Sequence, residues 1–450
     1  MFTALLPLLK GGHRKPSRRP KRPVRLWLEV LEERWAPSTD IWQPGAANAL
    51  WSNKANWSEG HPPMPSEQVV FDGNVANKPV EIDSGVNPTP FTINIQNVLF
   101  QNNYSAQMTL DAGITLDAAF GFNFSAGTAN IDFKGTGASK SVLEADGGTS
   151  QLAKFQFTDQ RGQVYQKAGA LILSQTGTSD SYSDFIIGAG GQLTVNNDAA
   201  VVNFHKGAGI TIQPSGSMTV LDTGFGAAVL SDSGDGGIIE NWGSFNYKGG
   251  NNETTVDMAF LNHDQATFDT GEFVFGHSSP LTNGYSYWMD NTAGAATTLK
   301  NGLDLVVADP GYYQTGGLLS VADSNQAEIQ GYAEIDGGKV QLGTATTFGT
   351  LKVSQSLDFN GGEFDPKING PAGGAGKEDS ITAYQITVKA GTLKVNAING
   401  GVAANQTWKI LVGTASSPSP IGDFTTKQFP GGVRGPDSTQ APKDIYQLDS

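Results

Sequence analysis

The 450-residue chain contains no cysteine. This absence excludes disulfides, thiol nucleophiles, thiolate zinc sites and redox switches, and it fits an exported bacterial protein. Charged residues are also scarce, at 16% of the chain, which argues against a coiled coil and against disorder driven by charge. Glycine is abundant, with 57 residues, and 22 prolines accompany it. The composition therefore indicates a long, turn-rich chain whose fold does not depend on cross-links.

Arginine is nearly absent from most of the chain, because only Arg161 and Arg434 occur after Arg34. Residues 1–36 hold nine Lys and Arg against three acids, whereas the remaining residues hold 20 bases against 40 acids. The formal net charge of −14 thus combines a basic segment of +6 with an acidic body of −20. Binding to nucleic acid requires clustered Lys and Arg, so we expect no nucleic-acid partner for the body.

Long apolar runs are missing as well. No run approaches the roughly 20 residues that cross a bilayer, so no transmembrane segment is expected. The first predicted domain is a basic N-terminal segment over residues 1–38. Its apolar stretch at residues 2–9 precedes the basic, Pro-rich stretch, which reverses the order found in a secretory signal. From these residues alone, the segment is either a disordered basic tail or a targeting address.

A short motif near the end of this segment carries a resemblance. Leu28, Glu29, Leu31, Glu32 and Arg34 form the pattern L-E-x-L-E-x-R, preceded by Arg-Arg-Pro-Lys-Arg-Pro and followed by Trp-Ala-Pro-Ser. The pattern resembles the N-terminal segment of large exported repetitive proteins of planctomycete bacteria. The resemblance implies that these five residues form an export and sorting motif, and that the protein lies at the cell surface or outside the cell. It implies no activity.

Three tryptophans mark the second predicted domain, residues 39–79. Trp42, Trp51 and Trp57 allow two interpretations: a surface of flat rings that contacts glycans, or a cap that fills the open end of a β-core with large aromatic side chains. The stretch Trp51-Ser-Asn-Lys-Ala-Asn-Trp57 is similar to the opening of bacterial surface proteins whose passenger resembles autotransporter β-solenoids.

Residues 80–370 contain many short segments in which apolar residues stand two apart, which is the pattern of half-buried strands. Ile210-Thr-Ile212 and Met218-Thr-Val220 are examples, and glycine separates most of the later ones. Such spacing suits an antiparallel sandwich or a parallel β-helix. The unbroken length of the series favours an all-β fold, a right-handed parallel β-helix with three strands of about eight residues in each of roughly twelve coils.

Corner residues give mixed signals about strand pairing. Asn241 and Asn262 each lie just before a strand, where an asparagine at a corner of a stacked coil can bond backbone groups. Hairpin-type dipeptides keep antiparallel pairing open. These dipeptides are Asn283-Gly284, Asn301-Gly302, Asp336-Gly337 and Asn369-Gly370.

The last predicted domain, residues 371–450, contains terminal coils or a cap and a polar tail. Strand patterns at Ile386–Val388 and Trp408–Val412 resemble the terminal coils of autotransporter-like passengers. A solenoid needs such an end, because an uncovered last turn exposes strand edges and core side chains.

Signs of catalysis are weak. Lyases that resemble this fold use an Arg or Lys base with Ca²⁺ and carboxylates, and neither Arg161 nor Arg434 lies near a cluster of acidic residues in the sequence. The similar pectinase-type hydrolases use an adjacent Asp pair and a Gly-His-Gly motif, whereas this chain has no Asp-Asp and only Gly276-His277-Ser278. We therefore predict no catalytic residues and no enzyme activity.

Signs of a cofactor are equally weak. The five histidines are scattered without metal-ligand spacing. Asp232-Ser-Gly-Asp235 begins like a calcium loop but lacks the later ligands of an EF-hand, which leaves a Gly-rich turn or a weak surface Ca²⁺ site. No other cofactor is expected.

The sequence as a whole predicts an exported, non-enzymatic β-solenoid with a structural or adhesive role, whose partners are extracellular glycans or cell-envelope components. Two alternatives stay open. One is a polysaccharide-active β-helix enzyme, either a lyase or a glycoside hydrolase, and the other is a carbohydrate-binding surface protein.

Overall fold

The chain divides into two units, Met1–Ala36 and Pro37–Ser450. The computed structural model describes residues 38–449 of the second unit with gaps, so the sorting motif of Leu28, Glu29, Leu31, Glu32 and Arg34 lies outside the described residues. The gaps are residues 46–47, 86, 88, 135–138, 159–161, 168, 174–176, 180–183, 190, 197–200, 205–208, 222–228, 232–236, 251–252, 277–286, 301, 308–309, 323–325, 370–377, 399–406, 416–421 and 431–444.

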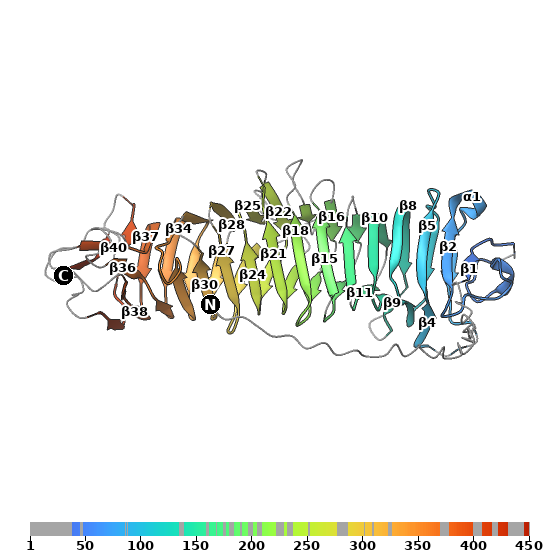
Figure 1. The fold of residues 1–450 in the computed structure, drawn as a ribbon, viewed down its shortest axis with the longest axis horizontal. Coiled ribbons are helices and arrows are strands. Elements are labelled where there is room, and N and C mark those ends of the chain that lie inside the picture. Colours follow the sequence, from blue (N-terminus) through green and yellow to red (C-terminus); the bar gives the residue numbers. More distant parts are fainter. Residues whose placement is uncertain are drawn as a thin grey trace, which may run out of the picture. The chain divides into compact units, whose positions relative to one another are not determined.

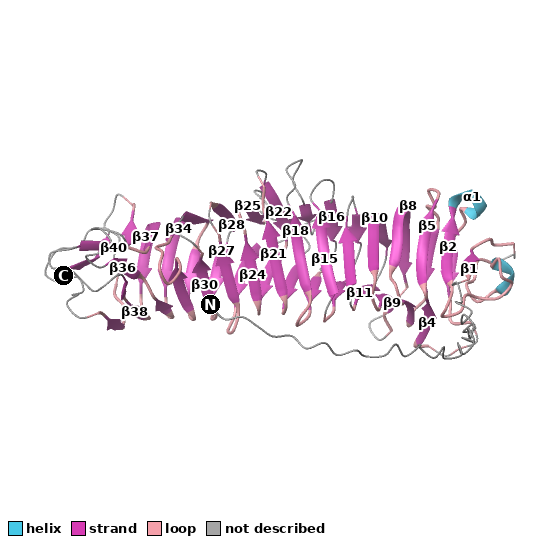
Figure 2. Ribbon diagram, in the orientation of Figure 1, coloured by secondary structure: helices cyan, strands magenta, loops and turns pink. Residues whose placement is uncertain are grey.

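The described part of the second unit is a parallel β-solenoid of about 11 turns, in which 61% of the residues lie in strands and 2% in helices. Figure 1 shows the strands following one another along a single axis in the order of the sequence, and Figure 2 shows how little of the unit is helical. The predicted parallel β-helix is therefore confirmed, and the sandwich alternative is wrong. Some turns exceed the expected 24 or so residues: Asn262 and Asn291 occupy the same place in successive turns and are 29 residues apart.

Each turn contributes one strand to each of three stacks, because most strands pair in parallel with the strand three positions later in the chain. Stack 1 consists of β1 (Thr39–Ile41), β2 (Gln68–Asp72), β5 (Asn97–Gln101), β12 (Gly169–Leu173), β15 (Gly191–Asn196), β18 (Ser217–Leu221), β21 (Ser244–Lys248), β24 (Gln265–Phe268), β27 (Ala296–Leu299), β30 (Leu318–Val321), β33 (Lys339–Leu342), β35 (Glu363–Phe364), β38 (Thr392–Lys394) and β41 (Thr426–Gln428).

The other two stacks have the same parallel construction. Stack 2 consists of β3 (Val80–Ile82), β6 (Gln107–Leu110), β13 (Gly177–Ser179), β16 (Val201–Phe204), β19 (Val229–Ser231), β22 (Glu253–Asp257), β25 (Gly271–Phe275), β28 (Leu303–Val307), β31 (Gln326–Gln330) and β40 (Thr407–Gly413). Stack 3 consists of β4 (Phe91–Ile95), β7 (Ile114–Ala118), β9 (Ser141–Ala145), β11 (Gly162–Gln166), β14 (Asp184–Ile187), β17 (Ile210–Ile212), β20 (Ile238–Asn241), β23 (Ala259–Asn262), β26 (Tyr287–Asn291), β29 (Pro310–Gln314) and β32 (Ala333–Ile335).

Four long strands pass from one stack into the next. β8 (Phe122–Phe133) and β10 (Thr149–Thr158) join stacks 1 and 2, and β34 (Thr350–Phe359) and β37 (Ser380–Val388) join stacks 2 and 3. β36 (Lys367–Asn369) and β39 (Asn396–Ile398) form a separate parallel pair. Among the described strands, β42 (Ile445–Asp449) alone pairs antiparallel, with β40. The short helices are η1 (Lys54–Asn56) and α1 (Gly73–Ala76).

The interior is built by the alternation that the sequence predicts. In β18, Met218 and Val220 are fully buried, while Ser217 and Thr219 on either side are half-buried on the outer face. Fully burying an apolar side chain of this size stabilises the folded chain by roughly 1.5–3 kcal/mol. The repetition of this pattern in turn after turn forms one continuous core.

An asparagine ladder runs inside one corner and includes Asn241 and Asn262, for which the sequence suggested a corner position with bonds to backbone groups. Both side chains and that of Asn291 are fully buried. The Asn241 Nδ2 group donates to Asn262 Oδ1 at 2.7 Å, and Asn262 Nδ2 donates to Asn291 Oδ1 at 2.9 Å. Asn291 Nδ2 then donates to the Leu318 carbonyl at 3.0 Å. The ladder satisfies polar groups that the bend of the chain would otherwise leave unpaired in the core.

Glycines occupy the corner between stacks 3 and 1. Gly317 and Gly338 take φ angles of +65° and +71° in successive turns. A Cβ atom on Gly338 would lie 2.3 Å from the carbonyl oxygen of Gly317. The dipeptide Asp336-Gly337 at this corner connects β32 to β33, which pair with different strands. It is therefore not a hairpin, and Asn283, Gly284, Asn301 and Gly370 of the other dipeptides lie outside the described residues.

Both predicted end segments contribute strands to the solenoid. β1 pairs with β2 and β2 with β5, so parallel stacking already begins within residues 39–79. At the other end, β37 and β40 continue the stacking beyond residue 370. The C-terminal segment also supplies β42, which covers the edge of β40.

Candidate functional site

The outer face of stack 1 carries a row of uncharged polar side chains. They lie in register on consecutive strands, spaced by the roughly 4.8 Å between neighbouring strands, and each is half-buried. Between Thr298 Oγ1 and Ser320 Oγ the distance is 3.0 Å. We call this row the hydroxyl–amide column: Thr194, Thr219, Asn246, Thr267, Thr298, Ser320 and Gln341.

An exposed tryptophan lies at the corner that leads into this column. Trp242 is 43% exposed and sits between β20 and β21, two residues before the first residue of β21. Its ring stacks on that of His263, with centroids 3.7 Å apart and planes 14° apart. His263 Nδ1 lies 2.9 Å from Thr292 Oγ1, which fixes the imidazole beneath the indole. The sequence did not single out Trp242; its signal is a large apolar residue between a corner asparagine and a glycine.

The outer face of stack 2 is acidic instead. Glu253, Glu272, Asp304 and Glu328 lie in register on successive strands, and Lys352 follows on the next. Burial, and then the charges of Glu253 and Asp304, raise the pKa of Glu272. Burial and the charge of Glu328 likewise raise the pKa of Asp304. Lys352 Nζ lies 2.8 Å from Glu328 Oε2 and compensates one end of this acidic column.

Stack 3 brings together a carboxylate group that the sequence did not predict. One ligand atom each of Asp117, Glu144 and Asp146 lie within 4.8 Å of one another. Lys167 pairs with Glu144, and its Nζ lies 2.8 Å from Asp146 Oδ1. Burial, followed by the charges of Asp146 and Glu144, raises the pKa of Asp117 to about 6. A carboxyl group with such a pKa beside two further carboxyl groups has the properties of a general acid.

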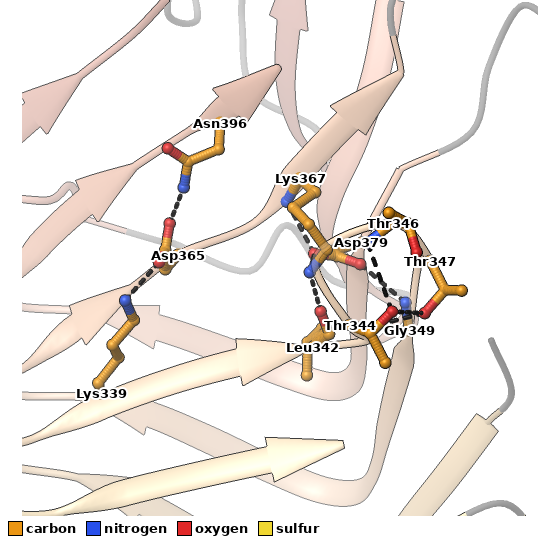
Figure 3. Close-up of polar contacts among 10 residues, drawn as sticks. All are labelled: Lys339, Leu342, Thr344, Thr346, Thr347, Gly349, Asp365, Lys367, Asp379 and Asn396. Carbon is orange, nitrogen blue, oxygen red and sulfur yellow. Dashed lines mark hydrogen bonds and ion pairs between the residues drawn. The ribbon is translucent and has the colours of Figure 1, made fainter. Parts of the chain in front are cut away.

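A second lysine–carboxylate pair is closed to substrates. Lys367 Nζ lies 2.7 Å from Asp379 Oδ2, and the two side chains are 6% and 0% exposed. Asp379 also accepts from the backbone N–H groups of Gly349 and Lys367, both at 2.7 Å, and Lys367 Nζ donates to the Leu342 carbonyl. Figure 3 shows these contacts converging on Asp379. Burial raises the pKa of Asp379 to about 6. The pair connects β36 to the corner before β34. Its role is therefore structural.

The three tryptophans of the N-terminal end are buried. Trp42, Trp51 and Trp57 are 0%, 2% and 3% exposed. The ring of Trp57 lies 5.0 Å from that of Trp42 and 4.7 Å from that of Trp51, and all three pack near Phe71. Trp42 Nε1 donates to the Lys78 carbonyl at 3.2 Å. Stacking on a sugar requires an exposed ring face, so this burial favours the cap over the glycan surface.

A groove of about 610 Å³ lies beside this cap. Pro62, Pro63 and Pro65 line one part of it, and Ser52 and Asp83 line another. Asp83 Oδ2 accepts from Ser52 Oγ at 2.6 Å, so its carboxylate is already committed to the fold. None of the three carboxylates on stack 3 lines this groove.

Two groups of potential metal ligands occur in the described part of the chain: Asp40, His61 and Glu67, and the stack 3 carboxylates. In the latter, Lys167 already supplies the positive charge. The candidate calcium residues Asp232 and Asp235 lie outside the described residues, as do Arg161, Arg434, His205 and His277.

No protein-family model, curated protein or solved structure matches the chain. Among the described residues, no helix combines the length and the apolar character needed to cross a membrane.

Proposed function

We propose that this chain is an exported, non-enzymatic β-solenoid of the cell surface or extracellular space, which contacts glycans along the outer face of stack 1. The observation that carries the proposal is the hydroxyl–amide column with the exposed Trp242 at its side. Neutral sugars offer hydroxyl groups and flat apolar ring faces. Threonine and asparagine side chains match the former, and an indole ring matches the latter.

The mechanism is multivalent. Each of the seven turns that the column spans presents one member, so an extended glycan meets a hydroxyl or amide group every 4.8 Å or so. Individually weak contacts then add through a high effective concentration. Continuous pairing of neighbouring strands keeps the members of the column in register, and the backbone therefore contributes rigidity while the side chains contribute the contacts.

Trp242 provides the most direct test of the glycan contact. Binding of the full chain to a panel of insoluble polysaccharides, including cellulose, chitin and pectin, is measured by co-sedimentation. Trp242→Ala is expected to weaken binding by about tenfold, equivalent to about 1.4 kcal/mol, because the ring face is lost. The matched control is Tyr384→Ala, which removes an aromatic ring that is 55% exposed on β37. Equal binding by both variants and the parent chain would refute the assignment.

The export part of the proposal rests on the L-E-x-L-E-x-R resemblance and the lack of cysteine. Deleting residues 1–38 is expected to keep the protein inside the cell. Normal export of the shortened chain would remove the targeting role.

A second function, glycoside hydrolysis, is favoured by the raised pKa of Asp117 beside Glu144 and Asp146. Release of reducing ends from the same polysaccharides, abolished by Asp117→Asn but not by Trp242→Ala, would replace the adhesive role with an enzymatic one. The ion pairs of Lys167 with Glu144 and Asp146 favour charge compensation within the fold instead.

A further inference from the structure

Three side chains from three segments meet at the N-terminal end of the solenoid. Asp40 lies on β1, Glu67 immediately precedes β2, and His61 belongs to the Pro-rich loop between them. One ligand atom of each lies within 4.8 Å of the others. Asp40 and Glu67 are 0% and 2% exposed. We propose that Asp40, His61 and Glu67 bind a divalent transition-metal ion of the Zn²⁺ class that fastens the loop to the first two strands.

Asp40 shows the clearest need for a cation. Its Oδ1 accepts from Ser58 Oγ at 3.0 Å and from the Glu59 N–H at 3.1 Å. Its Oδ2 is buried and has no hydrogen-bond partner among the described residues. A buried carboxylate oxygen without a partner is costly, and nearly all such atoms in folded proteins are paired. A metal ion bonded to Oδ2 removes this deficit.

His61 is oriented as a metal-bound histidine is. Its Nδ1 lies 3.0 Å from the Pro62 carbonyl oxygen, which can only accept, so Nδ1 carries the proton. In the neutral ring the lone pair is therefore on Nε2, which lies 3.8 Å from Glu67 Oε1. A ligating histidine usually donates its other N–H to a carbonyl or carboxylate in this way. Two lone-pair atoms at this separation leave room for an ion bonded to both at about 2.1 Å.

Glu67 is held in place by two further hydrogen bonds. Ser38 Oγ donates to Oε1 at 2.9 Å, and the Met64 N–H donates to Oε2 at 2.7 Å. Both carboxylates of the group are thus oriented by neighbours that are not ligands, as the carboxylates of metal sites commonly are. These contacts come from the same loop and from the residue before β1, so the whole group is preformed by the fold.

The donor set selects the class of ion. One imidazole nitrogen with two carboxylate oxygens suits Zn²⁺ and its transition-metal neighbours, whereas Ca²⁺ takes six to eight oxygen ligands. The His61 side chain is 36% exposed, which gives the ion an entry path and leaves a coordination position for water. The carboxylates on stack 3 differ from Asp40 and Glu67 in one respect, because Lys167 already supplies a positive charge beside them.

The expected consequence is a more stable N-terminal end. Among the described residues no turn precedes β1, and the Pro-rich loop and the buried tryptophans cap this end of the core. An ion that bridges β1, this loop and the start of β2 binds the folded form only, because the unfolded chain does not bring the three side chains together. Ion binding at this end of the solenoid does not depend on glycan binding by stack 1.

The test uses the full chain after removal of metals with EDTA. Isothermal titration is expected to show one equivalent of Zn²⁺ bound, and Zn²⁺ is expected to raise the midpoint of thermal unfolding by several degrees. Asp40→Asn and His61→Ala should each weaken Zn²⁺ binding at least about tenfold. Because Asp40→Asn alters a buried group, the half-buried His61 provides the variant that leaves packing intact. Glu59→Gln is the matched control, since it removes an exposed carboxylate of the same loop.

Three results would overturn the proposal. The first is the absence of Zn²⁺ stabilisation in the parent chain, which would leave an ion pair between a protonated His61 and Glu67. The second is an unchanged Zn²⁺ affinity in both the Asp40→Asn and His61→Ala variants. The third is an equal response to Ca²⁺, which would contradict the transition-metal assignment.

Discussion

Single corner residues decide whether neighbouring turns can approach each other. At the corner between stacks 3 and 1, the space for a side chain is taken by the backbone of the preceding turn. Gly338 combines a φ angle of +71° with a carbonyl oxygen 2.3 Å from the position of a Cβ atom. The glycine surplus of the sequence thus has a local cause, in which backbone conformation and close approach act at the same position.

The cost of the left-handed backbone and the cost of close approach can be separated by comparing Gly338→Ala with Gly302→Ala. Gly302 has nearly the same φ angle, +70°, but nothing lies within 4 Å of its Cβ position. Gly302→Ala is expected to lower the free energy of unfolding by about 1 kcal/mol, from the left-handed backbone alone. Gly338→Ala is expected to cost at least about 2 kcal/mol, because strands must also move apart. Denaturant unfolding measures both, and equal losses would show that close stacking does not limit this corner.

At the scale of an element, the asparagine ladder links strands that the hydrophobic core alone would not hold in register. Asn262 is both acceptor and donor in it, so it couples β20, β23 and β26. Asn262→Ala leaves the Asn241 amide short of one acceptor in a buried corner. We expect the free energy of unfolding to fall by about 2–4 kcal/mol.

The control for the ladder is Asn246→Ala on the outer face. Asn246 Nδ2 donates to Ser244 Oγ at 3.0 Å in a half-buried position, where water can replace the lost contact. Its loss is expected to stay below about 1 kcal/mol. If the two variants unfold at the same denaturant concentration, the ladder contributes no more than a surface hydrogen bond.

The sequence predicts features within a strand better than contacts between turns. The alternation of apolar and polar residues predicts that Met218 and Val220 are buried. The positions of Asn241 and Asn262 just before strands predict that these residues lie at a corner. Alternation depends on neighbours two residues apart and needs no knowledge of turn length. Contacts between turns can be predicted only when the length of each turn is known, because successive ladder residues are 21 and then 29 residues apart.

Unequal turn length explains why both carboxylate groups escaped prediction. Asp117 lies beside Glu144 only because their strands stack in a particular register. Asp40 meets Glu67 and His61 because a loop folds back over β1. Trp242 was missed for a different reason. A tryptophan in a strand-rich sequence is expected to lie in the core, and its exposure can be predicted only when the position of the corner is known.

At the scale of the whole molecule, acid is expected to stabilise the fold. Burial raises the pKa of Asp117 and Asp379 from 3.8 to about 6. It also raises the pKa values of Asp40, Asp111, Glu272, Asp304 and Glu378, whereas that of Asp72 is lowered, chiefly by the side chain of Asn102. Between about pH 6 and pH 4 the folded chain therefore holds more protons than the unfolded chain, and its stability increases as the pH falls.

The measurement is the midpoint of denaturant unfolding between pH 7.5 and pH 5. We expect it to rise on acidification by an amount on the order of 1 kcal/mol in the free energy of unfolding. Asp117→Asn removes one of the two described carboxyl groups whose pKa is raised to about 6, so it should reduce this gain. A midpoint that falls from pH 7.5 to pH 5 would show that the pKa values of these buried carboxyl groups are not raised in the folded chain.

The proposed function requires that the outer face of stack 1 binds glycans without converting them. The most direct measurement incubates the full chain with the polysaccharide that it binds most tightly and follows retention and reducing-end release in the same sample. We expect retention without release, and a loss of retention that deepens when Thr219, Thr267 and Thr298 are changed to glutamate one after another. Retention unaffected by all three changes, or release of reducing ends, would contradict the claim.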